Sequence, residues 1–437
     1  MSYKQRIIRT LRCQNKNVIG MLAKVTSTIS ALGGDIGDIK TISLGTFHNI
    51  RDFTVGCRDM DHLEQLVTAL NAIPEVTILA QIDEVMNLHR GGKLLVQARY
   101  PIHSIHDLQK VYTPGVAAVS RHIQDHPEDG YEYTTIGKTV GLITNGSRVL
   151  GLGNIGPVAS MPVMEGKAAL FSQFSGLAMI PVLCDTLDPD KFVETVMTIA
   201  PTFAAIQLED IRVPDCFEIE QKLIDRLNIP VMHDDQHGTA VVSLAATINA
   251  CRTAGLDLKK AVVGQIGLGA AGSSIAQLIM SYTGNPVLGF DPQPALAKRF
   301  ADLGGTLAAS QDEVMKKADV VIATTGKADI IQPASVRKGQ IILALSNPYP
   351  EISIVEAINA GAAFASDGSH VNNLLGFPGI FKGAVAARAT RITQEMYLAA
   401  ALSIVDQTPD HELIPDPLNP ELHNRVAQAV AAAYRAP

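Results

Sequence analysis

The sequence predicts an α/β protein in three parts, in which helices cover mainly parallel sheets. Short apolar segments such as VGLITN, FAAIQ, DVVIATTG and QIILALSNP alternate with helical patterns over most of the chain, as expected for parallel sheets with helices on both faces. A glycine-rich turn, GLGAAG, joins one apolar segment directly to a helical pattern. The length of 437 residues and the apolar fraction of 47% allow about two to four domains with cores of their own.

Residues 1–83 predict a small ferredoxin-like domain with the element order βαββαβ. The segments RIIRTLRC, DIGDIKTISLGT, HNIRDFTVGC and EVTILAQID have strand patterns, and LEQLVTAL has a helical one. Another helix follows the first strand, with Leu22, Val25, Ile29 and Leu32 on one face. This part contains no cluster of catalytic residue types, so we expect it to serve binding or assembly.

The same element order, with NVIGMLAKVTSTISALGGDI joining the first strand to the first helix, resembles the ACT regulatory domain. The resemblance implies that the domain pairs through its sheet and binds an amino acid or similar metabolite as effector. The expected ligand position is the turn at Gly20, where glycine lets a ligand approach the backbone closely. The alternative is a domain that only assists dimerisation.

Residues 84–240 and 241–379 predict two larger α/β domains. The linker-like segment MNLHRGGKLLVQARYPIHS leads into the first of them, whose strand patterns are VGLITN, RVLGLG, MIPVL, FAAIQ and IPVMH. The second contains AVVGQIG, NPVLGFD, DVVIATTG, QIILALSNP and AAFASDG. We expect the helices of residues 380–437 to fold back and complete the domain that begins at residue 84.

The GLGAAG turn has the Gly-x-Gly-x-x-Gly spacing of a dinucleotide-binding loop. Such a loop turns tightly, admits the pyrophosphate to a helix N-terminus and packs that helix on the strand. Asp291 ends the next strand pattern, 19 residues beyond the last glycine, where a carboxylate accepts hydrogen bonds from a ribose 2′-hydroxyl but repels a 2′-phosphate. We therefore predict a Rossmann-like domain that binds NAD rather than NADP. The predicted cofactor-binding residues are Gly267, Gly269, Ala270, Ala271, Gly272 and Asp291.

Two pairs of acidic residues follow apolar strand patterns, Glu209 and Asp210 after FAAIQL, and Asp234 and Asp235 after IPVMH. The carboxyl ends of parallel strands share one edge of a sheet, so these carboxylates would repel one another unless a cation neutralised them. Oxygen ligands favour Mg²⁺ or Mn²⁺ over zinc. The motif HDDQH also lacks the glutamate that zinc hydrolases carry at its second position. The alternative is that the acids cap the helices that follow them.

The composition excludes several classes of function. The chain has 36 basic and 43 acidic side chains, a formal net charge of −7, which disfavours nucleic acid as a partner and, taken alone, an anionic substrate. It has no apolar segment of membrane-spanning length, and its start, MSYKQRIIRT, lacks a signal core. Five scattered cysteines without a CxxC pair indicate a reducing compartment. We expect a soluble cytoplasmic protein with no membrane partner.

Six linked motifs occur in one order from Tyr112 to Phe381. They are VYTPGVA, NGSRVLGLGNIGPVASMPVMEGKAALF, QLEDI, PVMHDDQHGTA, LALSNP and VNNLLGFPGIF. Together they closely resemble the malic enzyme family, specifically its small prokaryotic members. The ACT-like part lies outside the core of that family. Many members have Asp where GLGNIG contains Asn154, and we assign that residue no catalytic role.

The resemblance implies catalytic roles for Tyr112 and Lys167. From the local pattern alone, Tyr112 would be an ordinary turn tyrosine and Lys167 a surface lysine. Lys167 would be the general base, with a pKa lowered by low polarity and a nearby cation, and Tyr112 would be the general acid. Asp234 would support Lys167. The implied ligands of Mg²⁺ or Mn²⁺ are Glu209, Asp210 and Asp235.

The implied substrate is L-malate, which would be converted to pyruvate and CO₂ as NAD⁺ is reduced. Arg148 would bind a malate carboxylate through its planar guanidinium. Asn347, Asn372 and Asn373 would line the pocket for substrate and nicotinamide. Alternatives are a malolactic enzyme, which retains its cofactor and releases lactate, and a ligand-sensing protein with a dead catalytic domain. The resemblance also implies a homodimer or larger assembly.

Overall fold

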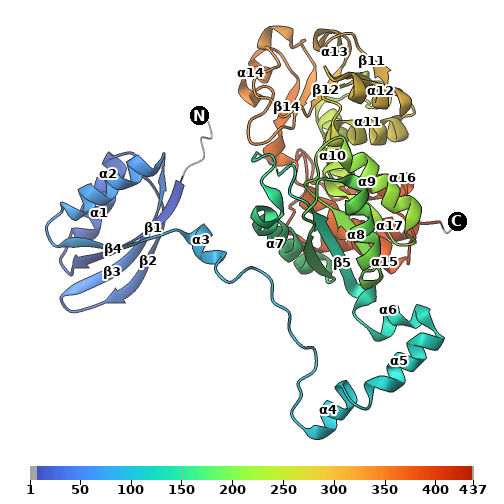
Figure 1. The fold of residues 1–437 in the computed structure, drawn as a ribbon. Helices are drawn as coiled ribbons and strands as arrows, with labels where there is room; N and C mark the ends of the chain where they lie inside the picture. Colours follow the sequence, from blue (N-terminus) through green and yellow to red (C-terminus); the bar gives the residue numbers. More distant parts are fainter. Residues whose placement is uncertain (1–6, 150, 436–437) are drawn as a thin grey trace. The chain divides into compact units, whose positions relative to one another are not determined.

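The computed structural model describes residues 7–149 and 151–435, and the chain divides into two compact units (Figure 1). The first unit comprises residues 1–95 and the second residues 96–437. The finer domain boundaries expected within the second unit remain predictions.

The first unit is a four-stranded antiparallel sheet with two helices on one face (Figure 1). Its strand order is β2-β3-β1-β4, so the predicted ferredoxin-like βαββαβ topology is confirmed. The elements are β1 (Ile7–Lys16), α1 (Met21–Ala31), β2 (Asp35–Leu44), β3 (His48–Cys57), α2 (Met60–Asn71), β4 (Val76–Ile82) and α3 (Glu84–Leu88).

The predicted core face of α1 is wrong in part. The helix buries Met21, Val25 and Ile29, whereas Leu22 and Leu32 are 41% and 38% exposed. Residues four apart lie on one face of a helix, and the sheet selects the face that starts at Met21. The residues of this core come from both helices and from β1, β3 and β4.

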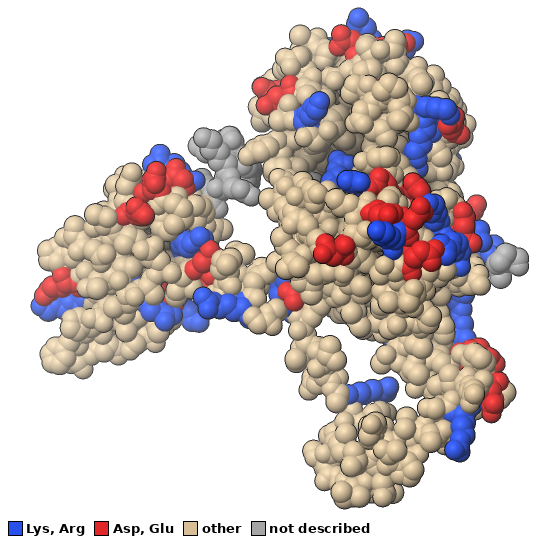
Figure 2. Space-filling view, viewed as in Figure 1, with Lys and Arg blue, Asp and Glu red and all other residues tan. Residues whose placement is uncertain are grey.

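The second unit begins with a segment in which no residue between 95 and 129 is buried. It contains α4 (Ile105–Val111) and α5 (Val116–Asp125), and α6 (Gly130–Tyr133) follows. Ile105 is 72% and Val111 48% exposed, although both are large and apolar. In the view of Figure 2 the surface over α4 is largely free of charged side chains.

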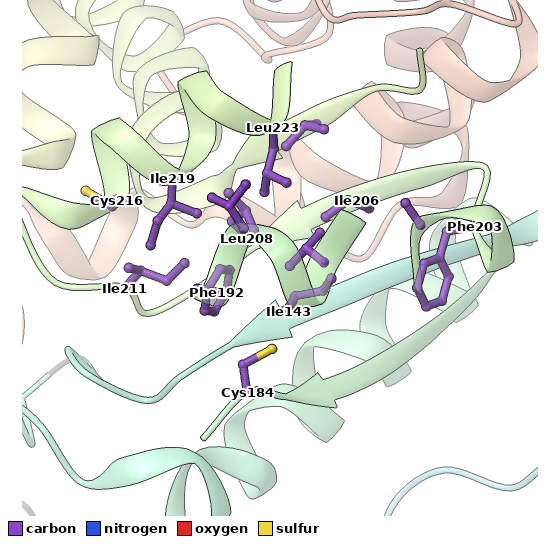
Figure 3. Packing of buried hydrophobic residues seen from close by; sticks show 14 of the residues in the cluster. Ile143, Cys184, Phe192, Phe203, Ile206, Leu208, Ile211, Cys216, Ile219 and Leu223 are labelled. Atoms are coloured by element: carbon purple, nitrogen blue, oxygen red, sulfur yellow. The ribbon is translucent and has the colours of Figure 1, made fainter. Parts of the chain in front are cut away.

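A four-stranded parallel sheet with the order β6-β5-β7-β8 forms the next part of the second unit. A core of large side chains, including Phe192, Ile206 and Leu223, packs between its strands and helices (Figure 3). The strands are β5 (Thr139–Thr144), β6 (Ala178–Leu183), β7 (Ala205–Leu208) and β8 (Val231–His233). The helices are α7 (Gly156–Ser175), α8 (Pro189–Ile199) and α9 (Asp215–Arg226).

The predicted strand RVLGLG is wrong for its described residues, 148–149 and 151–153; residue 150 lies outside the described residues. An isolated bridge joins Val149 and Gly153 instead. Gly151 and Gly153 have φ values of 74° and 73°, a left-handed backbone that an extended strand does not adopt.

A six-stranded parallel sheet follows, in the order β11-β10-β9-β12-β13-β14. This is the 3-2-1-4-5-6 order of the Rossmann fold, so the predicted dinucleotide-binding architecture is confirmed. The strands are β9 (Val263–Ile266), β10 (Leu288–Phe290), β11 (Thr306–Leu307), β12 (Val320–Ala323), β13 (Ile341–Ala344) and β14 (Phe364–Asp367). The helices are α11 (Ala270–Thr283), α12 (Pro294–Asp302), α13 (Gln311–Lys317) and α14 (Ile354–Asn359).

The long helix α10 (Asp234–Ala254) connects the two parallel sheets and is buried over most of its length. It begins directly after β8 and ends at Gly255, whose φ of 70° is typical of a glycine that terminates a helix. After the Rossmann sheet come α15 (Phe377–Ala386), α16 (Gln394–Asp406) and α17 (Pro420–Ala433). The ring of Phe377 in α15 lies 6.1 Å from that of Phe171 in α7, so the C-terminal part packs against the earlier sheet domain. No helix among the described residues is long and apolar enough to cross a membrane.

Candidate active site

Three carboxylates meet at the carboxyl end of the four-stranded sheet. Glu209 and Asp210 directly follow β7, and Asp235 lies in the first turn of α10, after β8. Because β7 and β8 are neighbouring parallel strands, their ends bring these residues together. One carboxylate oxygen from each residue lies within 4.8 Å of those from the other two. In the part of the chain that the structure describes, this is the one group of acidic, histidine or cysteine side chains so arranged.

The electrostatics of this cluster are unfavourable without a cation. Burial raises the pKa of Glu209 well above its usual range, against the opposing effect of Lys167. Burial and the Asp235 carboxylate raise the pKa of Asp210 to about 7. Asp210 also has a left-handed backbone with a φ of 54°, and its amide donates to Oδ2 of Asp235 at 3.1 Å. This amide hydrogen bond holds the carboxylate of Asp235 beside Asp210.

The donor set fits a hard divalent cation. Oδ2 of Asp210 is buried and has no hydrogen-bond partner among the described residues. Three carboxylates suit Mg²⁺ or Mn²⁺, which prefer oxygen ligands. Gln207 donates from Nε2 to Oε2 of Glu209 at 2.9 Å and is completely buried. Sequence reasoning missed Gln207, although a polar residue inside the apolar strand FAAIQL is a signal that could have identified it.

Lys167 lies beside the cluster, on α7. Its ammonium contacts Glu209, and donates to Oδ2 of Asp234 at 2.6 Å. Burial opposes the charge of Lys167, but the carboxylates of Asp234, Glu209 and Asp235 outweigh burial, so the pKa of Lys167 is raised. The expected lowering of the pKa of Lys167 includes the effect of a nearby cation and stays a prediction; the raised pKa is the effect of the three carboxylates alone.

Asp234 is not a member of the three-carboxylate cluster, and its side chain has no exposed surface. Besides the bond from Lys167, its Oδ2 accepts a hydrogen bond from Nδ2 of Asn373 at 3.3 Å. The amide of Asn373 is held in turn by Thr239 at 3.1 Å. Gly238 is needed here, since a Cβ at that position would lie 1.8 Å from Oδ1 of Asp234. Three of the four acids therefore form the cluster, and Lys167 contacts both one of its members, Glu209, and the fourth acid, Asp234.

The other predicted substrate-binding residues lie at different places around this edge. The backbone amide of Arg148 donates to the carbonyl oxygen of Asp210 at 3.0 Å, and its side chain is exposed. Asn347 follows β13 and donates from Nδ2 to the carbonyl oxygen of Gly368 at 3.0 Å. Asn372 accepts a hydrogen bond from the amide of Leu374 and so caps a short turn. Of the three asparagines, Asn373 is the one that contacts the Lys167–Asp234 pair.

Tyr112 does not join the other predicted catalytic residues. It ends α4 and is 67% exposed, within the segment that has no buried residue between positions 95 and 129. Among the described contacts, no hydrogen bond links its hydroxyl to Lys167, Asp234 or the three carboxylates. The structure of one chain therefore assembles the acidic site without its expected general acid.

The glycine loop of the Rossmann sheet has the geometry that its spacing predicts. Gly267 has a φ of 85°, and a Cβ on Gly272 would lie 1.9 Å from the carbonyl oxygen of Gly267. A Cβ on Gly269 would meet no atom within 4 Å, so that side of the loop is open. Gly269 precedes α11, and Ala270 and Ala271 form its first residues. The amides of a helix N-terminus beside open space are suited to a phosphate.

Asp291 follows β10 and is tied to the glycine loop. Its Oδ2 accepts a hydrogen bond from the amide of Leu268 at 2.8 Å, and its Oδ1 accepts one from the amide of Gln293 at 2.9 Å. Each carboxylate oxygen can accept a second hydrogen bond. The partly exposed side chain therefore retains acceptor sites for ribose hydroxyls.

Glu351 is a second residue that sequence reasoning missed. It is completely buried and accepts hydrogen bonds from the amide of Thr325 at 2.6 Å and from the hydroxyl of Ser346. These partners follow β12 and β13, so Glu351 joins two loops at the carboxyl edge of the Rossmann sheet. Nothing in the local pattern NPYPEIS distinguishes it from a surface glutamate.

The fold and the site together define an oxidoreductase of the dinucleotide-binding class, with a cluster of three carboxylates next to a partly buried lysine. Residues 93–224 match the family model of the malic enzyme N-terminal domain, and residues 365–435 match the malic enzyme NAD binding domain. Residues 262–356 match the NAD binding domain of 6-phosphogluconate dehydrogenase.

Similar proteins identify the family. The chain is 50% identical over 428 residues to NAD-dependent malic enzyme 1 of Bacillus subtilis, and the match covers 98% of each chain. It is 39% identical to the bifunctional malic/malolactic enzyme of the same organism, over 80% of this chain and 92% of that protein. The crystal structure of the NAD-dependent malic enzyme from Thermotoga maritima is 35% identical, with a TM-score of 0.74 over 79% of this chain and 98% of that chain. The chain therefore belongs to the malic enzyme family.

Proposed function

We propose that this chain catalyses the oxidative decarboxylation of L-malate to pyruvate and CO₂, with NAD⁺ as the hydride acceptor. The observation that carries the proposal is the contact of Lys167 with both Asp234 and the three-carboxylate cluster. A base, its supporting carboxylate and a cation site are the groups that this reaction needs at the hydroxyl-bearing carbon. The near full-length similarity to an NAD-dependent malic enzyme supports the same activity.

Glu209, Asp210 and Asp235 would hold Mg²⁺ or Mn²⁺, which when bound supplies positive charge for the malate hydroxyl and the enolate oxygen. Lys167 would remove the proton of the C2 hydroxyl as the hydride leaves C2 for the nicotinamide. The ammonium of Lys167 must first lose a proton. This loss would become easier once Glu209 serves the cation, because Glu209 would then no longer be the partner of the ammonium. Asp234 would then hold the amine in place, and Asn373 would hold Asp234.

Arg148 would bind a malate carboxylate, and Asn347 and Asn372 would line the substrate and nicotinamide pocket. The open loop at Gly269 supports binding of a dinucleotide, and the acceptor sites of Asp291 support NAD rather than NADP. Tyr112 would protonate C3 of enolpyruvate. Tyr112 is exposed in the single chain. Its role therefore requires an arrangement of the protein in which α4 contacts an active site.

We propose that this arrangement is a homodimer or larger assembly in which α4 and α5 pack against a second copy. Apolar side chains that line both helices are exposed in the single chain, and burying them would be favourable. These side chains are Ile105, Leu108, Val111, Tyr112, Val116 and Val119. A second copy would then supply Tyr112 to the site around Lys167.

Malolactic activity is the second candidate. It is favoured by the 39% identity to a bifunctional malic/malolactic enzyme. The acidic site alone does not separate the two reactions, because both begin with oxidation and decarboxylation of malate. A catalytically dead sensor is disfavoured by the intact contacts of Lys167, Asp234 and the three carboxylates.

The N-terminal unit is the proposed site of a small effector, such as an amino acid or another metabolite. Its ferredoxin-like topology supports the ACT-like interpretation, and Gly20 with a φ of 86° lies at the turn before α1. The cytoplasm is the proposed compartment, supported by five cysteines that are all buried and unpaired.

The test is an assay of the purified full-length chain with L-malate, Mn²⁺ and NAD⁺. We expect NADH and pyruvate in equal amounts. Lactate without net NADH would instead show a malolactic enzyme, and no turnover under any cofactor and metal condition would overturn both. The same assay with a panel of amino acids and other metabolites tests the effector.

A further inference from the structure

A buried glutamate that the proposed reaction does not use lies next to the acidic site. Glu220 is on α9, and its side chain is 7% exposed. A carboxylate this far from water requires hydrogen-bond donors from the protein. The partners of Glu220 therefore indicate what it does.

All three donors to Glu220 come from the corner between β8 and α10. Oε1 accepts a hydrogen bond from the backbone amide of His233 at 2.6 Å. Oε2 accepts one from Nε2 of Gln236 at 2.8 Å and one from Nε2 of His237 at 3.2 Å. The two oxygens of the Glu220 carboxylate thus hold the five-residue segment 233–237 at both of its ends.

Asp234 and Asp235 are the residues between these attachment points. Asp234 contacts Lys167, and Asp235 is a member of the three-carboxylate cluster. The N-cap residue of α10, His233, makes no side-chain capping hydrogen bond. Glu220 on a different helix therefore takes over part of the capping of α10, at the turn that directs both aspartates.

The far side of this segment is fixed as well. The ring of His237 stacks on that of Tyr397 from α16, with centroids 4.8 Å apart and planes 4° from parallel. His237 is thus held between Glu220 and Tyr397. The first turn of α10 cannot rotate without breaking these contacts.

We propose that Glu220 is a positioning residue for the divalent-cation site. Glu220 holds Asp235 in the geometry for ligation and Asp234 in the geometry for its contact with Lys167. This inference rests on the proposed cation site but not on which reaction the enzyme performs. Residues that orient metal ligands through hydrogen bonds typically change metal affinity or activity by about 10- to 100-fold when they are mutated.

The test compares Glu220→Gln with Glu218→Gln in the full-length chain. Glu218 lies on the same helix and loses the same charge, but it is exposed and pairs with Lys222 at 2.5 Å. Calorimetric titration of the metal-free proteins with Mn²⁺ measures binding without turnover. We expect Glu220→Gln to weaken Mn²⁺ binding by about 10- to 100-fold and Glu218→Gln to change it less than about twofold.

Steady-state kinetics provide a second measurement. In Glu220→Gln, the apparent KM for Mn²⁺ should rise by a larger factor than the factor by which kcat falls at saturating Mn²⁺. The reason is that excess cation restores the ligand geometry. Equal Mn²⁺ affinity in Glu220→Gln and wild type overturns the proposal, and so does an equal loss in both glutamate variants. A wild-type chain that does not bind Mn²⁺ overturns the cation site itself, which is a distinguishable result.

If Glu220→Gln does not fold, as judged by circular dichroism, the donors can be removed instead. The double variant Gln236→Met, His237→Phe leaves Glu220 in place, retains a ring for stacking on Tyr397 and removes two of the three hydrogen bonds. We expect it to weaken Mn²⁺ binding at least about tenfold. A folded double variant with wild-type affinity would overturn the proposal.

Discussion

The ammonium of Lys167 lies 2.6 Å from Oδ2 of Asp234, whose side chain is completely shielded from solvent. A fully buried carboxylate is costly to leave without a partner, so Asp234 depends on its contact with Lys167. The second carboxylate contacted by Lys167, Glu209, belongs to the three-carboxylate cluster. Lys167 is therefore coupled to the protonation and occupancy of that cluster.

Replacement of Lys167 by alanine should lower kcat by at least about 10²–10⁴-fold, the usual contribution of a general base. Circular dichroism should show that the fold is retained. Lys222→Ala is the matched control, because Lys222 also bridges two carboxylates, Asp190 and Glu218, but lies on the surface. Near-normal turnover in Lys167→Ala would remove Lys167 from the role of base.

A mixed assembly tests whether Tyr112 acts in the site of a second copy. Tyr112→Phe and Lys167→Ala should each be nearly inactive alone. If two copies exchange Tyr112, a purified heterodimer of the two variants contains one intact site and should show about half of the wild-type activity. Co-expression with two different affinity tags allows its isolation. A heterodimer as inactive as its parents would show that each chain uses its own Tyr112.

Cofactor preference should depend on Asp291. Asp291→Ser removes the negative charge that would repel a 2′-phosphate, so the ratio of kcat/KM with NADP to kcat/KM with NAD should rise. Total activity should fall as well, because Asp291 also accepts the amide hydrogen bond of Leu268 in the glycine loop. Asp302→Ser, at an exposed position on α12, is a control that should leave the ratio unchanged. An unchanged ratio in Asp291→Ser would mean that Asp291 does not set the preference.

The stability of the metal-free protein should depend on pH through Asp210. Burial and Asp235 raise its folded-state pKa to about 7, above its value in the unfolded chain. The folded state thus binds the proton more tightly, and this contribution to stability is lost as the pH rises through about 7. The Tm of the metal-free chain should fall between pH 6 and pH 8, and Asp210→Asn should show a smaller decrease. Mn²⁺ should raise the Tm more at pH 8 than at pH 6, since protons compete for the same oxygens. A Tm of the wild type that changes with pH no more than that of Asp210→Asn would contradict this assignment.

Local patterns were sufficient to predict much of the scaffold. Alternating strand and helix patterns predicted parallel sheets, and the glycine spacing predicted the loop before α11, because both depend on residues close together in the chain. The same reasoning failed at Leu22, where tertiary contact with the sheet selects the buried face of α1. It also failed at RVLGLG, where glycines with positive φ replace a strand. The net charge of −7 says little about the proposed anionic substrate, because three of the acidic residues gather in one cluster that could hold a cation.

The sequence by itself determined that acidic pairs follow two parallel strands and that a dinucleotide loop follows another strand. These features are local, and the carboxyl ends of parallel strands share one edge of a sheet. Only the tertiary structure decided that Asp235 joins Glu209 and Asp210 while Asp234 turns to Lys167, and that Asn373 rather than Asn372 contacts this pair. It also decided that neighbouring carboxylates raise the pKa of Lys167 and that Tyr112 lies apart at the end of an exposed helix. The physical reason is that side-chain direction, burial and the interaction of charges depend on distances between residues far apart in the chain, which no local pattern contains.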